Sequence, residues 1–533
     1  MNARKTNPVL WICGVAAALG LLSLACYAGL LPGPIASVLS LSVMGITFNS
    51  VPSTLRVPFV TAEFDSSKAQ QGPALMTYRA LLIGQKVAAG TGTANTLIKV
   101  TSAAEALIYG GRGSLLHRMA MAWFAANKST EVYLGVLSDN GAGAAATGTV
   151  TVTGPATADG TLVLYIGGDR IPVAVSSGDS AVTVAAALVA ALTDDLPVTG
   201  AVGVAPNDHV VTLTARHKGE TGNDIDVRAN YRDGESTPAG IGAAIVAMSG
   251  GTTNPVLTTL ITAMGDQWYN VIAFPYTDAT SLTAIEGELA DRFGPTRMVD
   301  GVAFACKAGN HATATALADG RNSPHVSIMG ANSSPTPTYE IAANVAAVVA
   351  YYGVSDPARP FQTLPLTWVL APAESARWTI VQRNLALYDN LSTFKVAAGD
   401  VVQIERLVTT YETNSAGAPD TAYYDVTTML TLMYLRYSFR TDFATKYPRH
   451  KLAADGTRIN AGQAIITPLL GKAEALHWFR EMEGLGLVEG FDQFKRDLVV
   501  ERNATDTNRL DFLLPPDVMN QLVVTAAKFE FRL

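Results

Sequence analysis

Residues 269–330 read YNVIAFPYTDATSLTAIEGELADRFGPTRMVDGVAFACKAGNHATATALADGRNSPHVSIMG, and this stretch decides the fold. Its apolar runs predict buried strands at Tyr269–Pro275, Val302–Cys306 and His325–Gly330. Between them, apolar residues three to four positions apart predict helices at Ala279–Phe293 and near Thr313–Ala318. Strands that alternate with helices pair in parallel, so the stretch predicts an α/β sheet with helices on both faces.

The same alternation continues on both sides of this stretch. Helices are predicted at Val256–Met264 and Tyr339–Tyr352. Far upstream, the strands Tyr78–Gly84 (YRALLIG) and Glu131–Leu137 enclose a helical pattern that begins at Leu115. The order strand, helix, strand predicts another parallel pair.

A different composition separates these two parts. Ser138–Gly148 is rich in Gly and Ala, and Gly167-Gly168-Asp169 further on predicts a tight hairpin turn. Short strands are expected at Thr149–Thr153, Thr161–Ile166, Arg170–Val175, Val210–Ala215 and Asp226–Tyr231. One Ala-rich helix, Ser180–Leu192, interrupts them, with Asp179 or Ser180 as its N-cap. Residues 149–250 are therefore predicted to form a small β-rich insertion.

The C-terminal part is mixed in character. We expect a strand at Val401–Tyr411, helices at Tyr423–Tyr447 and Lys472–Glu483, and a final strand at Lys528–Leu533, where polar and apolar residues alternate. The predicted fold is multidomain, of the α/β plus β class, with a doubly wound α/β core, a β-rich insertion and extended arms at both ends. The expected divisions are an apolar extension (1–43), an N-terminal arm (44–75), the first part of the α/β domain (76–148), the insertion (149–250), the rest of the α/β domain (251–375) and an α+β C-terminal domain (376–533).

The first residues allow two interpretations. No charged residue lies between Lys5 and Arg56, and Val9–Leu31 is apolar over the length of a membrane span, which is typical of a signal peptide or an anchor. Alternatively, translation begins at Met44, where the sequence has the character of an ordinary protein start. Residues 1–43 would then be an upstream extension that belongs to no fold.

The composition argues against several classes of function. The 533 residues carry 38 Lys and Arg against 45 Asp and Glu, a net charge of −7, so the chain lacks the positive field of a protein that coats nucleic acid. Charged residues make up 16%, below the usual share of about 25%, which suggests that much of the surface contacts protein. Three cysteines without a CxxC pair predict a reducing compartment, and the scattered histidines predict no metal site.

Two short patterns could carry chemistry, and neither is specific. Gly110–Ser114 (GGRGS) precedes a helix but lacks the GK[ST] ending of a phosphate-binding loop, which favours a tight turn capped by Ser114. Ser323, His325 and Asp319 are close in sequence, but no GxSxG nucleophile elbow occurs in the chain. We therefore predict no catalytic, cofactor-binding or metal site, and no enzymatic activity.

One stretch is locally basic and contains Lys446, Arg449 and Lys451 together with the aromatic Tyr447. This combination can suit nucleic acid. In an acidic chain it better suits an acidic protein surface, and a solvated loop is the alternative.

Six separated segments, in order along the body of the chain, carry a resemblance to a known family. They are Phe48–Ser53 (FNSVPS), Leu213–Asp224 (LTARHKGETGND), Arg321–Ser327 (RNSPHVS), Tyr447–Leu452 (YPRHKL), Phe491–Asp497 (FDQFKRD) and Leu513–Asp517 (LLPPD). Residues 46–533 resemble the tail sheath proteins of Mu-type contractile bacteriophages. Proteins of this family begin near Met44, so the resemblance favours the interpretation of residues 1–43 as an upstream extension.

The resemblance implies a structural protein that uses no cofactor and no nucleotide. Subunits of this family stack as six-membered rings around a rigid tail tube, and the stack contracts to drive the tube through the bacterial envelope. The implied partners are further copies of the chain, the tail tube protein, and the baseplate and tail terminator proteins, without direct contact to nucleic acid or, for the mature body, to a membrane. The implied location is the virion tail, preceded by the host bacterial cytoplasm during assembly.

The chain ends are the expected contacts between copies. An N-terminal arm, in which Pro52 and Pro58 exclude a helix, and the alternating C-terminal strand can each add to the sheet of a neighbouring subunit. The residues predicted to act in assembly are Phe48, Val51, Lys446, Arg449, Lys451, Lys528, Phe529, Phe531 and Leu533.

A second class of function stays open. Val9–Leu31 would also suit a membrane-anchored or exported β-rich surface protein. Within the favoured class, the sequence is compatible with an infectious phage, a defective prophage or a phage-tail-like bacteriocin.

Overall fold

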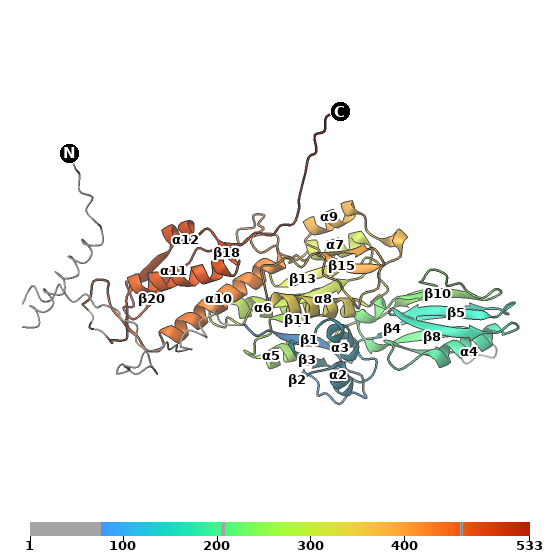
Figure 1. Cartoon of the computed structure of the whole chain (residues 1–533). Helices are drawn as coiled ribbons and strands as arrows, with labels where there is room; N and C mark the ends of the chain where they lie inside the picture. The colour runs from blue at the N-terminus through green and yellow to red at the C-terminus, as the bar shows by residue number, and fades with distance from the viewer. Residues whose placement is uncertain (1–75, 204–207, 459, 461) are drawn as a thin grey trace, which may run out of the picture. The chain divides into compact units, whose positions relative to one another are not determined.

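The computed structural model describes residues 76–203, 208–458, 460 and 462–533. A six-stranded sheet forms its centre, in the order β13-β12-β11-β1-β3-β2 (Figure 1). The strands are β1 (Arg79–Gln85), β2 (Leu97–Val100), β3 (Glu131–Leu137), β11 (Val271–Ala273), β12 (Val302–Lys307) and β13 (Val326–Gly330). All neighbours pair in parallel except β2, which is antiparallel to β3. The mixed α/β class and the predicted parallel pair of the first two strands are confirmed.

The two faces of this sheet bury different hydrophobic clusters, because successive side chains of a strand point to opposite faces. On β1, Ala80 and Leu82 pack in one cluster, and Leu81 and Ile83 pack in the other. The first cluster includes side chains of α3 (Leu115–Ala126) and α8 (Thr338–Gly353), and the second includes those of α5 (Thr258–Met264), α6 (Ala279–Phe293) and α7 (His311–Asp319). A further helix, α2 (Ala103–Gly110), packs against α3. Helices therefore cover both faces.

The segment between β3 and α5 folds into two antiparallel sheets, in the orders β10-β4-β8-β7 and β6-β5-β9. Its elements are β4 (Ala145–Thr153), β5 (Gly160–Ile166), β6 (Asp169–Val175), α4 (Ala181–Ala191), β7 (Val198–Val202), β8 (Val210–Lys218), η1 (Glu220–Asp224), β9 (Val227–Ala229) and β10 (Gly242–Ser249). Together they bury a hydrophobic cluster of their own, built around side chains such as Leu164, Val184 and Leu213.

Two local predictions for this segment are confirmed. Ile166 pairs with Asp169 across a two-residue turn in which Gly167 and Gly168 have φ of 56° and 84°. Both values are positive, as a tight hairpin turn of this kind requires. Ser180 caps α4 by accepting a hydrogen bond from the backbone N–H of Thr183.

Beyond α8, the chain first returns to the edge of the central sheet. The elements there are η2 (Glu374–Ala376), α9 (Ile380–Tyr388) and the antiparallel pair β14 (Thr393–Ala397) and β15 (Val401–Arg406). The predicted strand Val401–Tyr411 is too long, because the backbone leaves its ladder after Arg406. Val408 N–H donates to the Ser392 hydroxyl and Thr410 N–H donates to the Val326 carbonyl, so these groups bond to other segments.

The last part of the chain is organised around the long helix α10 (Val426–Lys446). It continues with β16 (Lys451–Leu452), β17 (Ile465–Ile466), α11 (Pro468–Gly484), β18 (Val488–Glu489), α12 (Phe491–Asp497), β19 (Val499–Arg502), β20 (Leu510–Leu513) and β21 (Asp517–Val518). Met429 and Met433 of α10 pack in the cluster under the central sheet, whereas Leu435 packs in a separate cluster with Trp478 and Phe494. The helix thus contributes to two cores.

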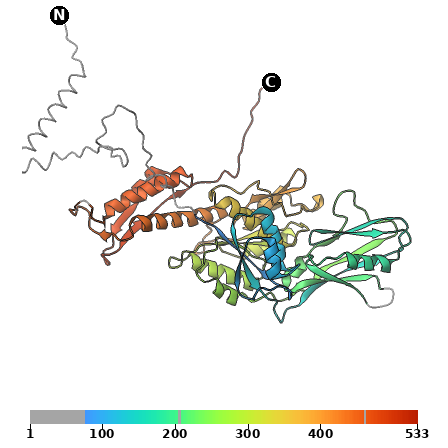
Figure 2. The ribbon, with the colours of Figure 1, turned by 60° about the horizontal axis from the view of Figure 1, so that its bottom comes forward.

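Residues 519–533 carry no helix or strand. Figures 1 and 2 show this C-terminal segment leading away from the folded part of the chain. The predicted strand Lys528–Leu533 has no pairing partner among the described residues and stays a prediction. In the described part of the chain, no helix is both long and apolar enough to cross a membrane, and Val9–Leu31 lies outside that part.

Candidate functional site

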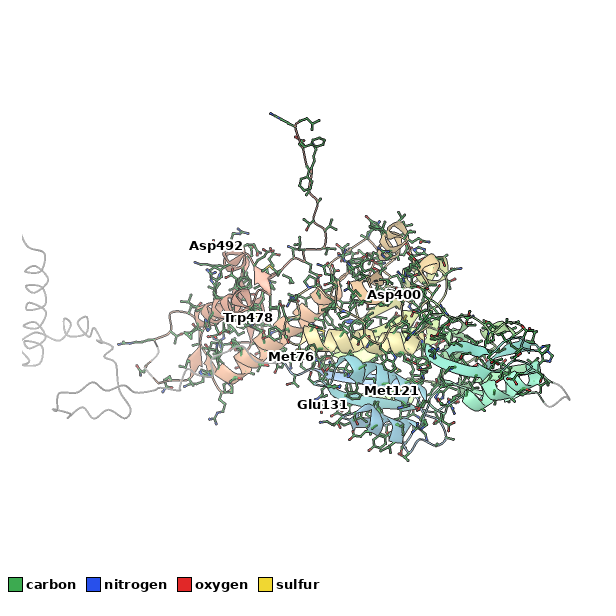
Figure 3. All side chains as sticks on the ribbon, turned by 45° about the vertical axis from the view of Figure 1, so that its right-hand side comes forward. Met76, Met121, Glu131, Asp400, Trp478 and Asp492 are labelled. Carbon is green, nitrogen blue, oxygen red and sulfur yellow. The ribbon has the colours of Figure 1, made fainter. Side chains whose placement is uncertain are left out.

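The C-terminal segment presents apolar side chains that the described part of the chain does not cover. Phe529 and Phe531 are 89% and 83% exposed, and Leu533 is fully exposed. Lys528 and Glu530 alternate with them and form an ion pair with each other. Figure 3 shows the side chains of this segment standing clear of the rest of the molecule. Since burial of a Phe or Leu side chain yields about 1.5–3 kcal/mol, the segment would gain free energy from a partner.

The C-terminal part also contains short sheets with open edges. β19 and β20 pair only with each other, as a two-stranded antiparallel sheet, among the described residues. Val499 and Leu513 on these strands are 46% and 61% exposed. An open strand edge offers unpaired backbone groups to an incoming strand.

One cation of the predicted basic stretch is ion-paired within the chain. Lys446, at the end of α10, forms ion pairs with Asp442 (2.9 Å) and Glu474, and the Tyr447 hydroxyl donates to Glu474. Burial raises the pKa of Glu474, but Lys446 outweighs it and holds that pKa below its ordinary value.

The other predicted assembly residues are less constrained. Arg449 is exposed and forms no salt bridge with any described residue, and Lys451 on β16 donates to the Gln463 side chain (2.9 Å). Phe48 and Val51 lie outside the described residues.

Helix α9 is a surface feature that the sequence prediction missed. Ile380, Val381, Leu385 and Tyr388 are 73%, 64%, 50% and 78% exposed. At 100° per residue these four positions fall within one arc of the helix, so they form an apolar stripe. A capping box starts the helix, in which Thr379 and the Gln382 side chain bond to each other's backbone N–H groups. The pattern T-x-x-Q before apolar residues was the available signal.

The structure does not assemble a catalytic triad from Ser323, His325 and Asp319. The Ser323 hydroxyl accepts a hydrogen bond from the backbone N–H of His325, and the His325 ring packs against Phe293 with 5.0 Å between ring centroids. Burial and the nearby Arg436 lower the pKa of His325 to about 4. Within the described residues, no group of three or more His, Cys, Asp or Glu side chains could hold a metal ion.

The GGRGS turn is closed by a side chain of the insertion. Ser114 caps α3 by accepting from the backbone N–H of His117, which confirms the predicted cap. The next N–H, of Leu115, donates to His217 Nε2 at 3.1 Å. His217 Nδ1 therefore carries the proton and donates to Asp139 at 2.8 Å. This helix N-terminus is occupied by protein rather than open to a phosphate.

A buried arginine makes the second link between the insertion and the body. The Arg118 Nε group on α3 donates to Glu340 on α8 (2.5 Å), and Nη1 donates to Asp169 at the insertion hairpin (2.7 Å). Trp368 Nε1 donates to the other oxygen of Glu340 (2.6 Å). The side chains of Arg118 and Glu340 are 2% and 1% exposed. Burial raises the pKa of Glu340, and the charge of Arg118 opposes that rise.

Comparison with known proteins identifies the family. The phage tail sheath protein central domain matches residues 250–410, and the phage tail sheath C-terminal domain matches residues 418–532. The Mu-like prophage FluMu tail sheath protein of Haemophilus influenzae is 42% identical over 490 residues, which cover 92% of this chain and 100% of that protein. The chain belongs to the phage tail sheath family. As a tail sheath protein, it is a structural component of a contractile tail, and its family is not enzymatic.

Two solved structures align with this tail sheath chain over most of its length. The sheath tail protein from Desulfitobacterium hafniense has 14% identity and a TM-score of 0.44, and the alignment covers 86% of this chain and 100% of that one. A chain of the anti-feeding prophage baseplate has 11% identity and a TM-score of 0.45, with 90% and 100% covered.

Proposed function

We propose that this tail sheath protein polymerises as stacked six-membered rings around a tail tube and contracts to drive the tube through the bacterial envelope. The observation that carries the proposal is the C-terminal segment, whose alternating apolar side chains are exposed and have no partner among the described residues. The open-edged β19–β20 sheet supports it, because a strand from another copy can pair there.

The free energies of strand pairing and side-chain burial suit a contact of this kind between two subunits. A strand that makes four or five main-chain hydrogen bonds, at about 0.5–1.5 kcal/mol net for each, contributes a few kcal/mol. Burial of Phe529 and Phe531 adds about 1.5–3 kcal/mol each. The same joint, repeated in every subunit of a cylinder, stabilises the array. Main-chain pairing also tolerates movement, since a donated strand can stay paired while the bodies rotate about flexible linkers.

The proposal also assigns partners to the other candidate contact surfaces. The N-terminal arm with Phe48 and Val51 supplies a second donated strand, and the region of Arg449 and Lys451 contacts an acidic surface of the assembly. The exposed stripe of α9 is a further contact, with the tail tube or with another sheath subunit. Contacts at the two ends of the cylinder would involve the baseplate and tail terminator proteins.

The domain division expected from the sequence forms part of the proposal. The insertion, residues 149–250, is proposed to project outward, and its separate hydrophobic cluster supports its treatment as a unit. The α/β part and the C-terminal part, 376–533, would form the inner layer. The particle is proposed to assemble in the host cytoplasm and to act in the virion tail.

Negative-stain electron microscopy of the purified protein tests the proposal. Striated cylinders with six-fold end views are expected at high protein concentration. Strictly monomeric particles at every concentration, with both chain ends intact, would overturn it. Recovery of the chain in the membrane fraction before lysis would instead favour an anchored surface protein.

A further inference from the structure

One hydrogen bond between the insertion and the first turn of α3 requires a neutral histidine. The Leu115 N–H donates to His217 Nε2 on β8 (3.1 Å), so Nε2 must carry a lone pair. Nδ1 then carries the proton and donates to Asp139 (2.8 Å). A protonated imidazole has N–H groups at both nitrogens and can only donate. Protonation of His217 would therefore remove the acceptor of the Leu115 N–H.

The surroundings of Nε2 offer a protonated ring no replacement partner. The His217 side chain is 8% exposed, and Nε2 has no hydrogen-bond partner besides Leu115 among the described residues. A cavity of about 10 Å³ beside the ring, lined in part by Gly113 and Tyr339, has room for at most about one water molecule. The N-terminus of α3 is also the positive end of the helix dipole, which repels an imidazolium. A proton on Nε2 would thus push the ring and the first turn of α3 apart.

Asp139 makes protonation of His217 attainable in spite of this burial. Its carboxylate also accepts hydrogen bonds from the Gln85 side chain (2.8 Å) and the Lys218 N–H (3.1 Å), which hold it beside the ring. Burial raises the pKa of Asp139, but the hydrogen bond and charge of His217 outweigh burial and keep that pKa below its ordinary value. A carboxylate that stays ionised stabilises an imidazolium next to it. Imidazole side chains ordinarily take up a proton between about pH 8 and 5.

The other charged groups around the ring are engaged elsewhere. The cations are Arg112 and Arg118 near the start of α3, and Arg216 and Lys218 on β8. The remaining acidic groups are Asp169, Asp194, Asp195, Glu220 and Asp224, together with Tyr339 and Glu340 on α8. The three arginines pair with Asp195, Asp194, Asp169 and Glu340. Among the described residues, Asp139 is the only carboxylate that bonds to the His217 ring.

A second buried histidine faces the same turn. The Gly113 N–H donates to His117 Nδ1 at 3.4 Å. Burial lowers the pKa of His117, and the charge of Asp195 opposes that shift only in part. Gly113 also fits closely against the insertion, since a Cβ there would lie 2.4 Å from the Asp194 carbonyl oxygen. Two rings that accept hydrogen bonds only when neutral therefore hold this turn against the insertion.

We propose that the contact between the insertion and the body is acid-sensitive, and that protonation of His217 opens it at the first turn of α3. Opening would leave both parts folded, because the insertion buries a hydrophobic cluster of its own. The ion pairs of Arg118 would remain as the other link, so the insertion would turn rather than detach. This inference concerns the single subunit and goes beyond the proposed function, since it assigns a conformational response to the junction between insertion and body.

Hydrogen exchange of the Leu115 amide in the full chain tests the proposal, with electron-transfer fragmentation and mass spectrometry as the readout. After correction for the intrinsic pH dependence of exchange, this amide should exchange about tenfold faster at about pH 5 than at about pH 7.5. His217→Gln should abolish the difference, because the Gln amide can accept from Leu115 and donate to Asp139 at either pH. His477→Gln, which changes an exposed histidine on α11, should retain it.

A distance measurement reports the turning of the insertion itself. In chains with Cys13→Ser and Cys26→Ser, spin labels at Ile108→Cys on α2 and Val246→Cys on β10 mark the body and the insertion, since both positions are exposed. Cys306 is buried, and burial raises the pKa of its thiol, so it should stay unlabelled. The distance distribution from double electron–electron resonance should shift or broaden at about pH 5 and stay unchanged when His217→Gln is added.

His217→Lys supplies a permanent charge and should give the acid-type exchange and distances already at about pH 7.5. If this variant does not fold, the comparison of the native chain with His217→Gln still decides. An equal acid response in those two chains, or no response in the native chain, would overturn the proposal. Rapid exchange of the Leu115 amide in His217→Gln at both pH values would also overturn it, because the charge of the ring would then not control the contact.

Discussion

Arg118 offers the sharpest test of how the insertion is held to the body. Its side chain is 2% exposed and pairs with Glu340, which is 1% exposed, and with Asp169 of the insertion. Arg118→Met keeps much of the side-chain volume and removes the charge. Glu340 would then be a buried carboxylate without a cation, with only the Trp368 N–H as a strong donor.

The size of the effect follows from this burial. Removal of one partner of a buried ion pair costs about 3–5 kcal/mol, because the remaining charge is uncompensated. Replacement of both partners avoids that charge, so Arg118→Met with Glu340→Gln should recover at least half of the loss. Arg112→Met is a matched control on the surface, where the pair with Asp195 should contribute about 0–1 kcal/mol.

Urea denaturation followed by tryptophan fluorescence measures these differences, since Trp123 is buried on α3 and Trp368 contacts Glu340. Burial raises the folded-state pKa of Glu340, so the folded state takes up a proton before the unfolded state does. The stability of Arg118→Met should therefore rise as the pH falls toward the ordinary pKa of a glutamate, and the double variant should lack this response. A loss below about 1 kcal/mol for Arg118→Met, or a double variant as unstable as the single one, would refute the reasoning.

Three further predictions follow from buried and exposed groups. Burial lowers the pKa of His325 to about 4 and raises the pKa of Asp300 to about 6. The two groups therefore change the folding stability in opposite directions as the pH falls. Relative to the native chain, His325→Gln should gain stability and Asp300→Asn should lose stability as the pH falls from 6.5 to 4, each by up to about 3 kcal/mol in urea titrations. Slopes of the same sign for the two variants would contradict this. Gly330→Ala should lower the thermal stability by about 1–3 kcal/mol, since its Cβ would lie 2.4 Å from the Trp378 ring, and an unchanged Tm would count against it. Leu385→Lys on α9 should leave urea unfolding unchanged while reducing assembly, and full assembly would remove α9 from the contacts.

Much of the fold could be predicted from local patterns. β3 and α6 begin and end at the predicted residues, because a continuous apolar run and a clean helical period leave little choice. β7 and β10 were missed, since β10 (GAAIVAMS) is rich in small residues with low strand propensity and is a strand because it pairs with β4. Helix α9 escaped detection because its apolar residues face outward, so they do not mark a core.

The candidate site likewise has features that the sequence reveals and features that it does not. The alternation at Lys528–Leu533 is visible in the sequence, and the structure leaves its apolar side chains exposed. The three basic residues near the end of α10 could not be separated by sequence alone, because the pairing of Lys446 depends on Glu474, 28 residues away. The link from Arg118 to Glu340 spans 222 residues, so it produces no local signal.

Deletion of Lys528–Leu533 tests most directly whether the chain end joins copies of this tail sheath protein. Far-ultraviolet circular dichroism and urea unfolding should show a folded subunit, since the side chains of Phe529, Phe531 and Leu533 are exposed. Electron microscopy should show dispersed subunits where the full chain forms long cylinders. Normal long sheaths from the truncated chain would contradict the account.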